Sequence, residues 1–270
     1  MPQNPASPAP RDWLLLIGGS TYKFTLTGFY LVALIAILKN HGYSLNQLSW
    51  IHLIGGIEAA KVLFAALMER RPAGRFGRFR GWLLAATLGL SAVFGLMAYT
   101  DMTRNFPLLL TCCVLLSAMS AVYGCAMLGL SCIVLPHRER GFGGVIQTMA
   151  ARGGKMTGGA LVLWLYQEYG QTAAAGFMLA FSLLMLLQLL YYREPKSPTA
   201  QGSWTALAAR LVSFWQQPET GWRWLVLLFA VAAPYAFMAA TFVPKLADLG
   251  FNPKQTGGIL AVGIPVACLI

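Results

Sequence analysis

Charge is scarce in this chain of 270 residues, and acidic charge is scarcer still. Only 11% of the residues are charged, and nine Asp and Glu stand against twenty Lys and Arg. A soluble domain carries about 25% charged and about 45–50% apolar residues, whereas this chain is 57% apolar with a mean hydropathy of +0.60. The composition excludes an ordinary soluble domain and indicates a membrane protein.

Residues that catalyse reactions or bind metals are also few. The three histidines are scattered, and none of the five cysteines has metal-ligand spacing with a histidine. No nucleophile-and-base set is visible. The glycine-rich stretches GRFGRFRG and RGFGG follow apolar runs rather than strands, which argues against a phosphate-binding loop. We therefore predict no enzymatic activity, no cofactor and no metal site.

Long apolar runs are abundant. Eight apolar runs can be counted, and each of the first seven reaches the ~20 residues that a helix needs to cross ~30 Å of hydrocarbon. The first run has no cleavage-site pattern and is too long for a signal peptide, so it is interpreted as a span. The pattern predicts an all-α integral membrane protein with spans at 13–38, 49–68, 81–99, 107–135, 145–166, 172–192, 222–244 and 255–270.

The basic residues lie mostly in short gaps between these runs. A net charge of +11 is compatible with nucleic-acid binding, but Lys and Arg also gather in the cytoplasmic loops of membrane proteins and orient the spans. With a cytoplasmic N-terminus, twelve Lys and Arg fall inside and only four fall outside, namely Lys39, Arg104, Lys245 and Lys254. We therefore predict a multi-pass protein of the bacterial inner membrane with a cytoplasmic N-terminus.

Two stretches repeat each other at a constant offset of 208 residues. LKNHGYSLNQLSWIHLIGG begins at Leu38 and LADLGFNPKQTGGILAVGI begins at Leu246, and they match without a gap at Leu, Gly, aromatic, Gln, Ile and Gly positions. Each stretch contains the exit of one span, a short turn and the start of the next span. The repeat predicts a six-span unit followed by a parallel copy, as in the major facilitator transporters.

This plan divides the chain into four parts. Residues 1–12 are a Pro-rich tail that is expected to be disordered, and 13–192 form a six-helix bundle. Residues 193–221 are a cytoplasmic linker, in which SWTALAARLVSFWQQ is expected to form an amphipathic helix on the membrane surface. Residues 222–270 begin a second six-helix bundle. The chain then covers spans 1–8 of twelve, so we expect the full protein to continue beyond Ile270.

Four motifs resemble one branch of the major facilitator superfamily. Residues 61–70, KVLFAALMER, are similar to its K-F-L-W-A-P-L-x-D-R signature at the end of span 2, and residues 77–84, GRFRGWLL, to its entry into span 3. LPHRERG at 135–141 resembles its L-x-P-x-E-R-G turn, and the arginine and glycines of 152–159 resemble its span 5. The branch holds the AmpG muropeptide permease, the acetyl-CoA transporters and the RhtX/FptX siderophore permeases.

The chain also departs from that branch. Ala66 and Glu69 stand where the branch has Pro and Asp, and Gly124 and Leu128 replace the two aspartates of its Q-D-x-x-x-D-G element in span 4. The role of those aspartates therefore cannot be carried over. The resemblance assigns a cytoplasmic gating loop to the charged residues at two turns: Glu69, Arg70, Arg78, Arg138, Glu139 and Arg140.

Ionisable residues inside the spans mark a candidate pathway for substrate and protons, because each costs at least ~2.5–3.5 kcal/mol at a helix centre. Glu58 lies near the middle of span 2, and Lys61 is three residues further on, so the two can pair. Either Glu58 titrates a proton while Lys61 is its partner or binds a substrate carboxylate, or the two form a structural ion pair. Lys23 in span 1 is expected to line the same cavity.

Span 5 carries two cations one turn apart, Arg152 and Lys155. They either line a positively charged cavity or extend to the cytoplasmic headgroups; the match of Arg152 to the branch favours the cavity. Tyr22, Tyr30 and Tyr123 are candidate contacts for a ring-bearing ligand, although aromatics in spans more often pack.

Together these inferences predict a secondary transporter, driven by protons, that imports a small ferric siderophore of the pyochelin type. The choice of this substrate depends on the resemblance to the siderophore permeases and on the missing aspartates. The alternative is a permease for muropeptides or another anionic metabolite. A second alternative, a non-transporting membrane scaffold, applies if the chain truly ends at Ile270. The expected partners are the substrate, protons and the lipid bilayer, with no nucleic acid.

Overall fold

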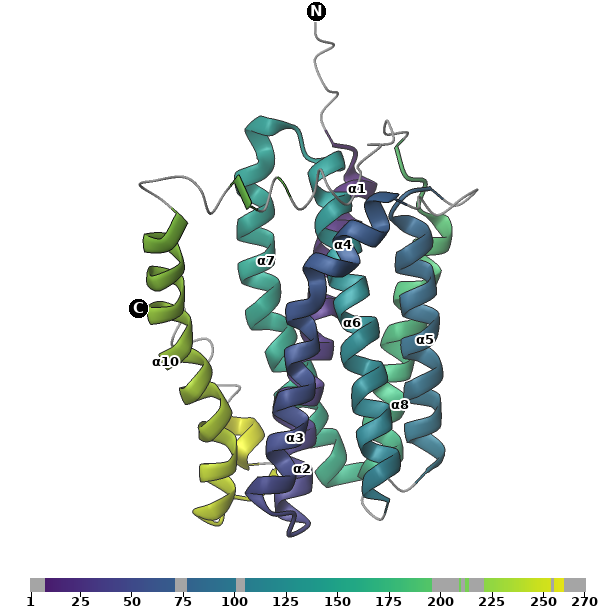
Figure 1. Ribbon diagram of the computed structural model, residues 1–270. Coiled ribbons are helices and arrows are strands. Elements are labelled where there is room, and N and C mark those ends of the chain that lie inside the picture. Colours follow the sequence, from purple (N-terminus) through teal and green to yellow (C-terminus); the bar gives the residue numbers. More distant parts are fainter. Residues whose placement is uncertain are drawn as a thin grey trace, which may run out of the picture.

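The computed structural model describes residues 8–70, 77–100, 105–195, 209, 212–213, 221–253 and 255–259. All regular structure within these ranges is helical, which confirms the predicted fold class. The helices stand side by side as a bundle, and α10 stands beside it (Figure 1). Most of the expected linker helix within 193–221, and the span expected after residue 259, lie outside the described residues.

In several places two consecutive α-helices are joined directly by a short π-helix or 3-10 helix, so that they form one long helical segment. The elements in chain order are α1 (Pro10–Gly28), π-helical η1 (Phe29–Ala33), α2 (Leu34–Asn40), α3 (Leu45–Gly55), 3-10 helix η2 (Gly56–Ala60), α4 (Lys61–Arg70), α5 (Arg80–Tyr99), α6 (Phe106–Val134), 3-10 helix η4 (His137–Glu139), α7 (Arg140–Lys155), π-helical η5 (Met156–Leu161), α8 (Val162–Tyr191) and α10 (Gly221–Asp248).

Helix α8 contains the break between two expected spans. Gly170 has φ 80° and ψ −174°, a backbone conformation that glycine adopts without the penalty other residues incur. The next side chain, Gln171, donates hydrogen bonds to the carbonyl oxygens of Met97 (2.9 Å) and Thr100 (2.6 Å) at the end of α5. The break falls between the fifth and sixth apolar runs, where the sequence predicts it.

Four helical stretches in the described ranges are long and apolar enough to cross a membrane, by length and composition. They are Pro10–Asn40, Arg80–Tyr99, Phe106–Val134 and Arg140–Tyr191. The last holds 52 residues, more than twice what one crossing needs, and the break at Gly170 divides it.

Helix α1 crosses the end of α7 and the following η5 at very short range because glycines leave room for the partner backbone. A Cβ at Gly154 would lie 2.6 Å from the backbone nitrogen of Thr25, and a Cβ at Gly158 would collide with the carbonyl oxygen of Thr25. The hydroxyls of Thr25 and Thr157 are hydrogen-bonded at 2.8 Å in the same contact. Close approach at small residues, joined by a hydroxyl pair, is how membrane helices gain packing without a hydrophobic driving force.

The repeat found in the sequence has a structural counterpart in two matching turns. Gly42 and Gly250 have φ of 83° and 84°. At the first turn Tyr43 N–H donates to the Leu38 carbonyl at 3.2 Å, and at the second Phe251 N–H donates to the Leu246 carbonyl at 3.2 Å. Both helices thus end in the same αL-glycine motif, which satisfies the last carbonyls of a helix.

These two turns lie next to each other at one end of the molecule. The Lys39 ammonium and the Asp248 carboxylate are 2.7 Å apart, so the end of α2 is joined to the end of α10. We call this the turn end of the bundle, and the end where α1 begins the N-terminal end. The first half of α10, near the N-terminal end, exposes its apolar side chains; Trp222, Phe229 and Val231 are all about 70% exposed.

Candidate functional site

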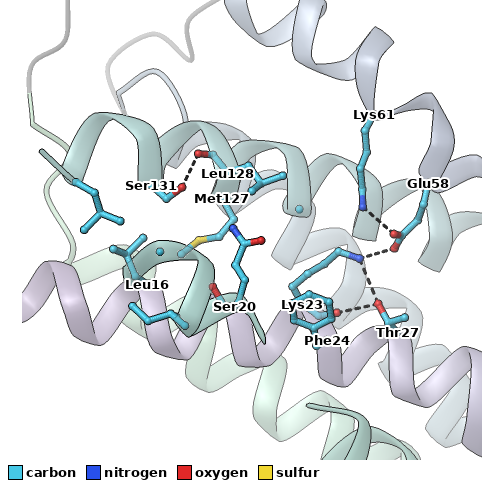
Figure 2. A pocket seen from close by; sticks show the side chains of 15 residues that line it. Leu16, Ser20, Lys23, Phe24, Thr27, Glu58, Lys61, Met127, Leu128 and Ser131 are labelled. Carbon is cyan, nitrogen blue, oxygen red and sulfur yellow. Dashed lines mark hydrogen bonds and ion pairs between the residues drawn. The ribbon is translucent and has the colours of Figure 1, made fainter. Parts of the chain in front are cut away.

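A cavity of about 160 Å³ lies among α1, η2, α4, α6 and α7. It extends from the middle of the bundle toward the N-terminal end, where Leu135 and Gly143 lie. Figure 2 shows that the side chains of Lys23, Glu58 and Lys61 gather at one side of this cavity. The lining residues are Leu16, Ser20, Lys23, Phe24, Thr27, Glu58, Lys61, Gly124, Met127, Leu128, Ser131, Leu135, Gly143, Ile146 and Gln147.

The backbone of the second passage positions Glu58. The glycine pair at 55–56 weakens helix formation, and residues Gly56–Ala60 wind as a 3-10 helix between α3 and α4. Such a stretch within a helix often marks a functional hinge or strain. Helix α6 supports the passage on both sides of η2, because Ser117 Oγ donates to the Ile54 carbonyl at 2.9 Å and Cys125 Sγ lies 3.6 Å from the Lys61 carbonyl.

The Glu58 carboxylate is the centre of the site. Its Oε1 accepts hydrogen bonds from the Lys23 ammonium, from Tyr30 Oη at 2.8 Å and from Ser120 Oγ at 3.1 Å. Its Oε2 accepts one from Lys61 Nζ at 2.8 Å. One carboxylate thus faces two ammonium groups, and the group as a whole carries one positive charge.

The two lysines have different surroundings. Lys23 Nζ donates to Glu58, to Thr27 Oγ1 at 3.2 Å and to Ser120 Oγ at 3.2 Å, and its side chain is 9% exposed. The side chain of Lys61 is 33% exposed. Figure 2 shows the two ammonium groups approaching the carboxylate from α1 and from α4.

Of the three tyrosines predicted to contact a ligand, one lies at the site and two are buried elsewhere. Tyr30 bonds to Glu58 and so belongs to the site. Tyr22 is fully buried, and its hydroxyl is 2.6 Å from Ser182 Oγ. Its ring packs edge-on against that of Tyr123 at 5.2 Å between centroids. Tyr123 is fully buried as well, and neither Tyr22 nor Tyr123 is among the cavity-lining residues.

The two cations of span 5 are not among the residues that line this cavity. Arg152 is exposed and Lys155 is half-buried, both near the end of α7. The cavity meets α7 instead at Gly143, Ile146 and Gln147, one to three turns earlier. Their assignment to the pathway therefore stays a prediction.

The predicted gating loop is described in part. Glu69 and Arg70 end α4, but their side chains lie outside the described residues. Arg138, Glu139 and Arg140 form the turn into α7, where the two arginines are exposed. The Arg78 guanidinium lies 5.3 Å from the centroid of the Phe79 ring.

A second carboxylate organises this end of the bundle. Glu194 accepts hydrogen bonds from the backbone N–H groups of Arg78, Phe79 and Arg80 at 2.8–3.2 Å, and it therefore caps the start of α5. In return, Arg80 donates to the carbonyl oxygens of Leu189 and Leu190 at the end of α8. Neither of these two caps was predicted from the sequence.

Sequence reasoning also missed Thr27 and Ser120. Thr27 is four residues after Lys23, so its hydroxyl lies on the same face of α1, and this spacing was a usable signal. Ser120 is 97 residues from Lys23, and nothing local indicates that contact. Within the described residues, no group of three His, Cys, Asp or Glu side chains is placed to hold a metal ion.

The sequence matches a known family along almost its whole length. Residues 15–270 match the family model of the Major Facilitator Superfamily. The chain belongs to this superfamily. Its helical fold and its two matching turns agree with this membership.

Two curated proteins resemble the chain closely enough to compare. The anhydromuropeptide permease of Escherichia coli strain K12 is 28% identical over 256 residues, and the protein of the same name from Escherichia coli O157:H7 matches to the same degree. Each alignment covers 92% of this chain and 51% of the relative, so the chain spans about half the length of these relatives. They favour the predicted muropeptide alternative over the ferric siderophore, which finds no support in them.

Proposed function

We propose that this major facilitator protein is a permease that imports an anionic sugar-peptide of the muropeptide class across the bacterial inner membrane. The observation that carries the proposal is the group formed by Lys23, Glu58 and Lys61 in the wall of the cavity. A group with one uncompensated positive charge within the membrane spans attracts an anion and repels a cation. The names of the two relatives supply the class of anion.

The cavity lining suits a solute with both polar and apolar parts. Ser20, Ser131 and Gln147 offer hydrogen bonds along the wall, while Phe24, Met127 and Ile146 are among the apolar contacts. A few placed polar groups within a mostly apolar lining are typical of small-molecule sites. The cavity holds only part of a sugar-peptide, and we propose that the second bundle of the superfamily fold contributes the rest.

We propose that protons drive the import and that Glu58 is the titrating group. Among the cavity-lining residues, Glu58 is the one carboxylate. Protonation would remove the charge that now holds Lys23 and Lys61 together, and would free positive charge for the solute. A coupling of this kind requires that proton and solute each favour the same state of the site.

The orientation belongs to the proposal as well. We place the N-terminal end of the bundle in the cytoplasm because twelve of the loop Lys and Arg residues then lie inside. The turn end, where Lys39 and Asp248 form an ion pair, would then face the periplasm.

Uptake into cells tests the substrate. Cells that lack their own anhydromuropeptide permease would express the full-length protein and receive radiolabelled anhydromuropeptide or, separately, ferric siderophores labelled with radioactive iron. We expect accumulation of the sugar-peptide and its abolition by a protonophore. Accumulation of a ferric siderophore instead, or of neither solute by protein shown to be in the membrane, would contradict the proposal.

A further inference from the structure

The two lysines of the site differ in how many of their donors are already used. We propose, on the basis of the proposed function, that Lys61 binds a single carboxylate of the transported solute, whereas Lys23 is a positioning residue that holds Glu58 and never meets the solute. The site then has one carboxylate subsite, located between Lys61 and the open part of the cavity.

Lys23 has no donor left for a ligand. An ammonium group has three N–H donors, and those of Lys23 point at Glu58 Oε1, Thr27 Oγ1 and Ser120 Oγ. Ser120 in turn donates to Glu58 Oε1 at 3.1 Å. The side chain of Lys23 is 9% exposed, so a solute would have to displace this network before it could contact the ammonium group.

The Lys61 ammonium group has N–H donors that are available to a ligand. Among the described residues, Glu58 Oε2 at 2.8 Å is its hydrogen-bond partner, which leaves two of its three donors for a ligand. Its side chain is 33% exposed and lines the cavity. Glu58 Oε1 takes three hydrogen bonds while Oε2 takes one, so the weakly held side of the carboxylate is the side that faces Lys61.

The absence of a side chain at Gly124 on α6 leaves room for the Lys23 side chain to lie across this helix. A Cβ at Gly124 would lie 3.7 Å from Cε of Lys61 and 2.7 Å from Cε of Lys23. A larger residue there would therefore push against Lys23 and would make only an ordinary contact with Lys61. Gly124 thus helps to place Lys23, and it leaves Lys61 accessible from the cavity.

The charge balance sets the class of ligand. While Glu58 is ionised it compensates one of the two ammonium groups, and the positive charge that remains equals the charge of one carboxylate. A charge-assisted hydrogen bond from Lys61 to that carboxylate would replace none of the Lys23 contacts. A neutral amide in the same place would lose this attraction.

The first experiment separates binding from the identity of the transported molecule. The purified full-length protein would be heated in detergent with N-acetylalanine or with N-acetylalaninamide, which differ by one negative charge. We expect the carboxylate to raise the unfolding temperature of wild type and Lys61→Arg more than the amide does. This preference should vanish in Lys61→Gln and persist in the control Lys245→Gln, an exposed lysine at the turn end.

The second experiment uses uptake of radiolabelled anhydromuropeptide and of the same molecule with its carboxylates amidated. Lys61→Gln should raise KM for the anion at least tenfold, which corresponds to about 1.4 kcal/mol, and should leave KM for the amide within twofold. Lys61→Arg should restore most of the affinity. Lys23→Gln should lower the amount of folded protein and the maximal rate, with KM of the remaining protein changed less than twofold.

The two proposals fail in different ways. If wild type transports no sugar-peptide but prefers the carboxylate in the heating experiment through Lys61, the proposed function is wrong and the subsite stands. If Lys61→Gln keeps the preference for the carboxylate, or if Lys23→Gln raises KM as much as Lys61→Gln does, the assignment of the two lysines is overturned.

Discussion

Replacing Glu58 by Gln should destabilise the protein strongly, because it leaves Lys23 buried without a counter-ion. The change keeps the size of the side chain and its ability to accept hydrogen bonds from Tyr30 and Ser120. It removes the negative charge that the Lys23 ammonium contacts directly. Removal of one partner from a buried ion pair costs about 3–5 kcal/mol. Lys61, whose side chain is one-third exposed, should add little to that cost.

Restoring a carboxylate from the other side of the lysines should repair the loss. A Cβ at Gly124 points between the two lysines, at 2.7 Å from Lys23 Cε and 3.7 Å from Lys61 Cε. An aspartate there reaches both ammonium groups after a small shift of the flexible Lys23 side chain. We expect Glu58→Gln with Gly124→Asp to recover more than half of the lost stability, and the uncharged control Gly124→Asn to recover none.

The free energy of unfolding would be measured by SDS titration of the full-length protein, followed by circular dichroism. A Glu58→Gln protein within 1 kcal/mol of wild type, taking ~1 kcal/mol as the worth of one ordinary hydrogen bond, would refute the buried ion pair. Equal recovery by aspartate and asparagine at position 124 would show that packing, and not charge, sets the stability of the site.

Two further predictions concern helix contacts outside the cavity. Gly158→Ala should prevent the close approach of α1 and η5 and abolish accumulation of folded protein, because its Cβ would collide with the Thr25 carbonyl. Gly153→Ala, whose Cβ meets nothing within 4 Å, should behave as wild type. Size-exclusion chromatography compares the two variants, and equal profiles would contradict the close approach. Reversing the charge of Lys39 or of Asp248 alone should separate α2 from α10 at the turn end and slow uptake severalfold. The double variant, in which the two charges are exchanged, should regain most of the uptake rate. If the double variant regains none of it, the ion pair does not matter for transport.

The spans were predictable because their signal is local. Hydropathy over about 20 residues places the apolar runs, and the break at Gly170 falls in the short gap between two of them. The pairing of Glu58 with Lys61 was likewise local, since residues three apart on a helix are neighbours. The matching turns at Gly42 and Gly250 followed from aligned residues, and the structure gives both glycines positive φ.

The contacts between side chains of different helices in the site could not be predicted in the same way. Lys23 and Glu58 are 35 residues apart, and their contact depends on how α1 and η2 are rotated against each other. The sequence placed Lys23 in the cavity from its depth in span 1, but it gave no partner. The assignment of Arg152 and Lys155 to the pathway, which charge and the resemblance favoured, stays a prediction, because the described cavity meets α7 at Gly143, Ile146 and Gln147.

The substrate was least predictable of all. The preference for a ferric siderophore depended on resemblance and on two missing aspartates, neither of which measures what the cavity binds. Glu58 supplies a carboxylate from span 2 to the two lysines that lie next to Gly124. The absence of an acid at position 124 therefore does not remove negative charge from the site, and it gives no reason to prefer a siderophore.

The most direct test of the central claim is uptake of radiolabelled anhydromuropeptide into liposomes that contain only the purified full-length protein. With an inward proton gradient, we expect accumulation above the outside concentration, and collapse of that accumulation when a protonophore is added. An uptake no greater than that of protein-free liposomes would contradict the account of this site as a pathway for an anionic sugar-peptide.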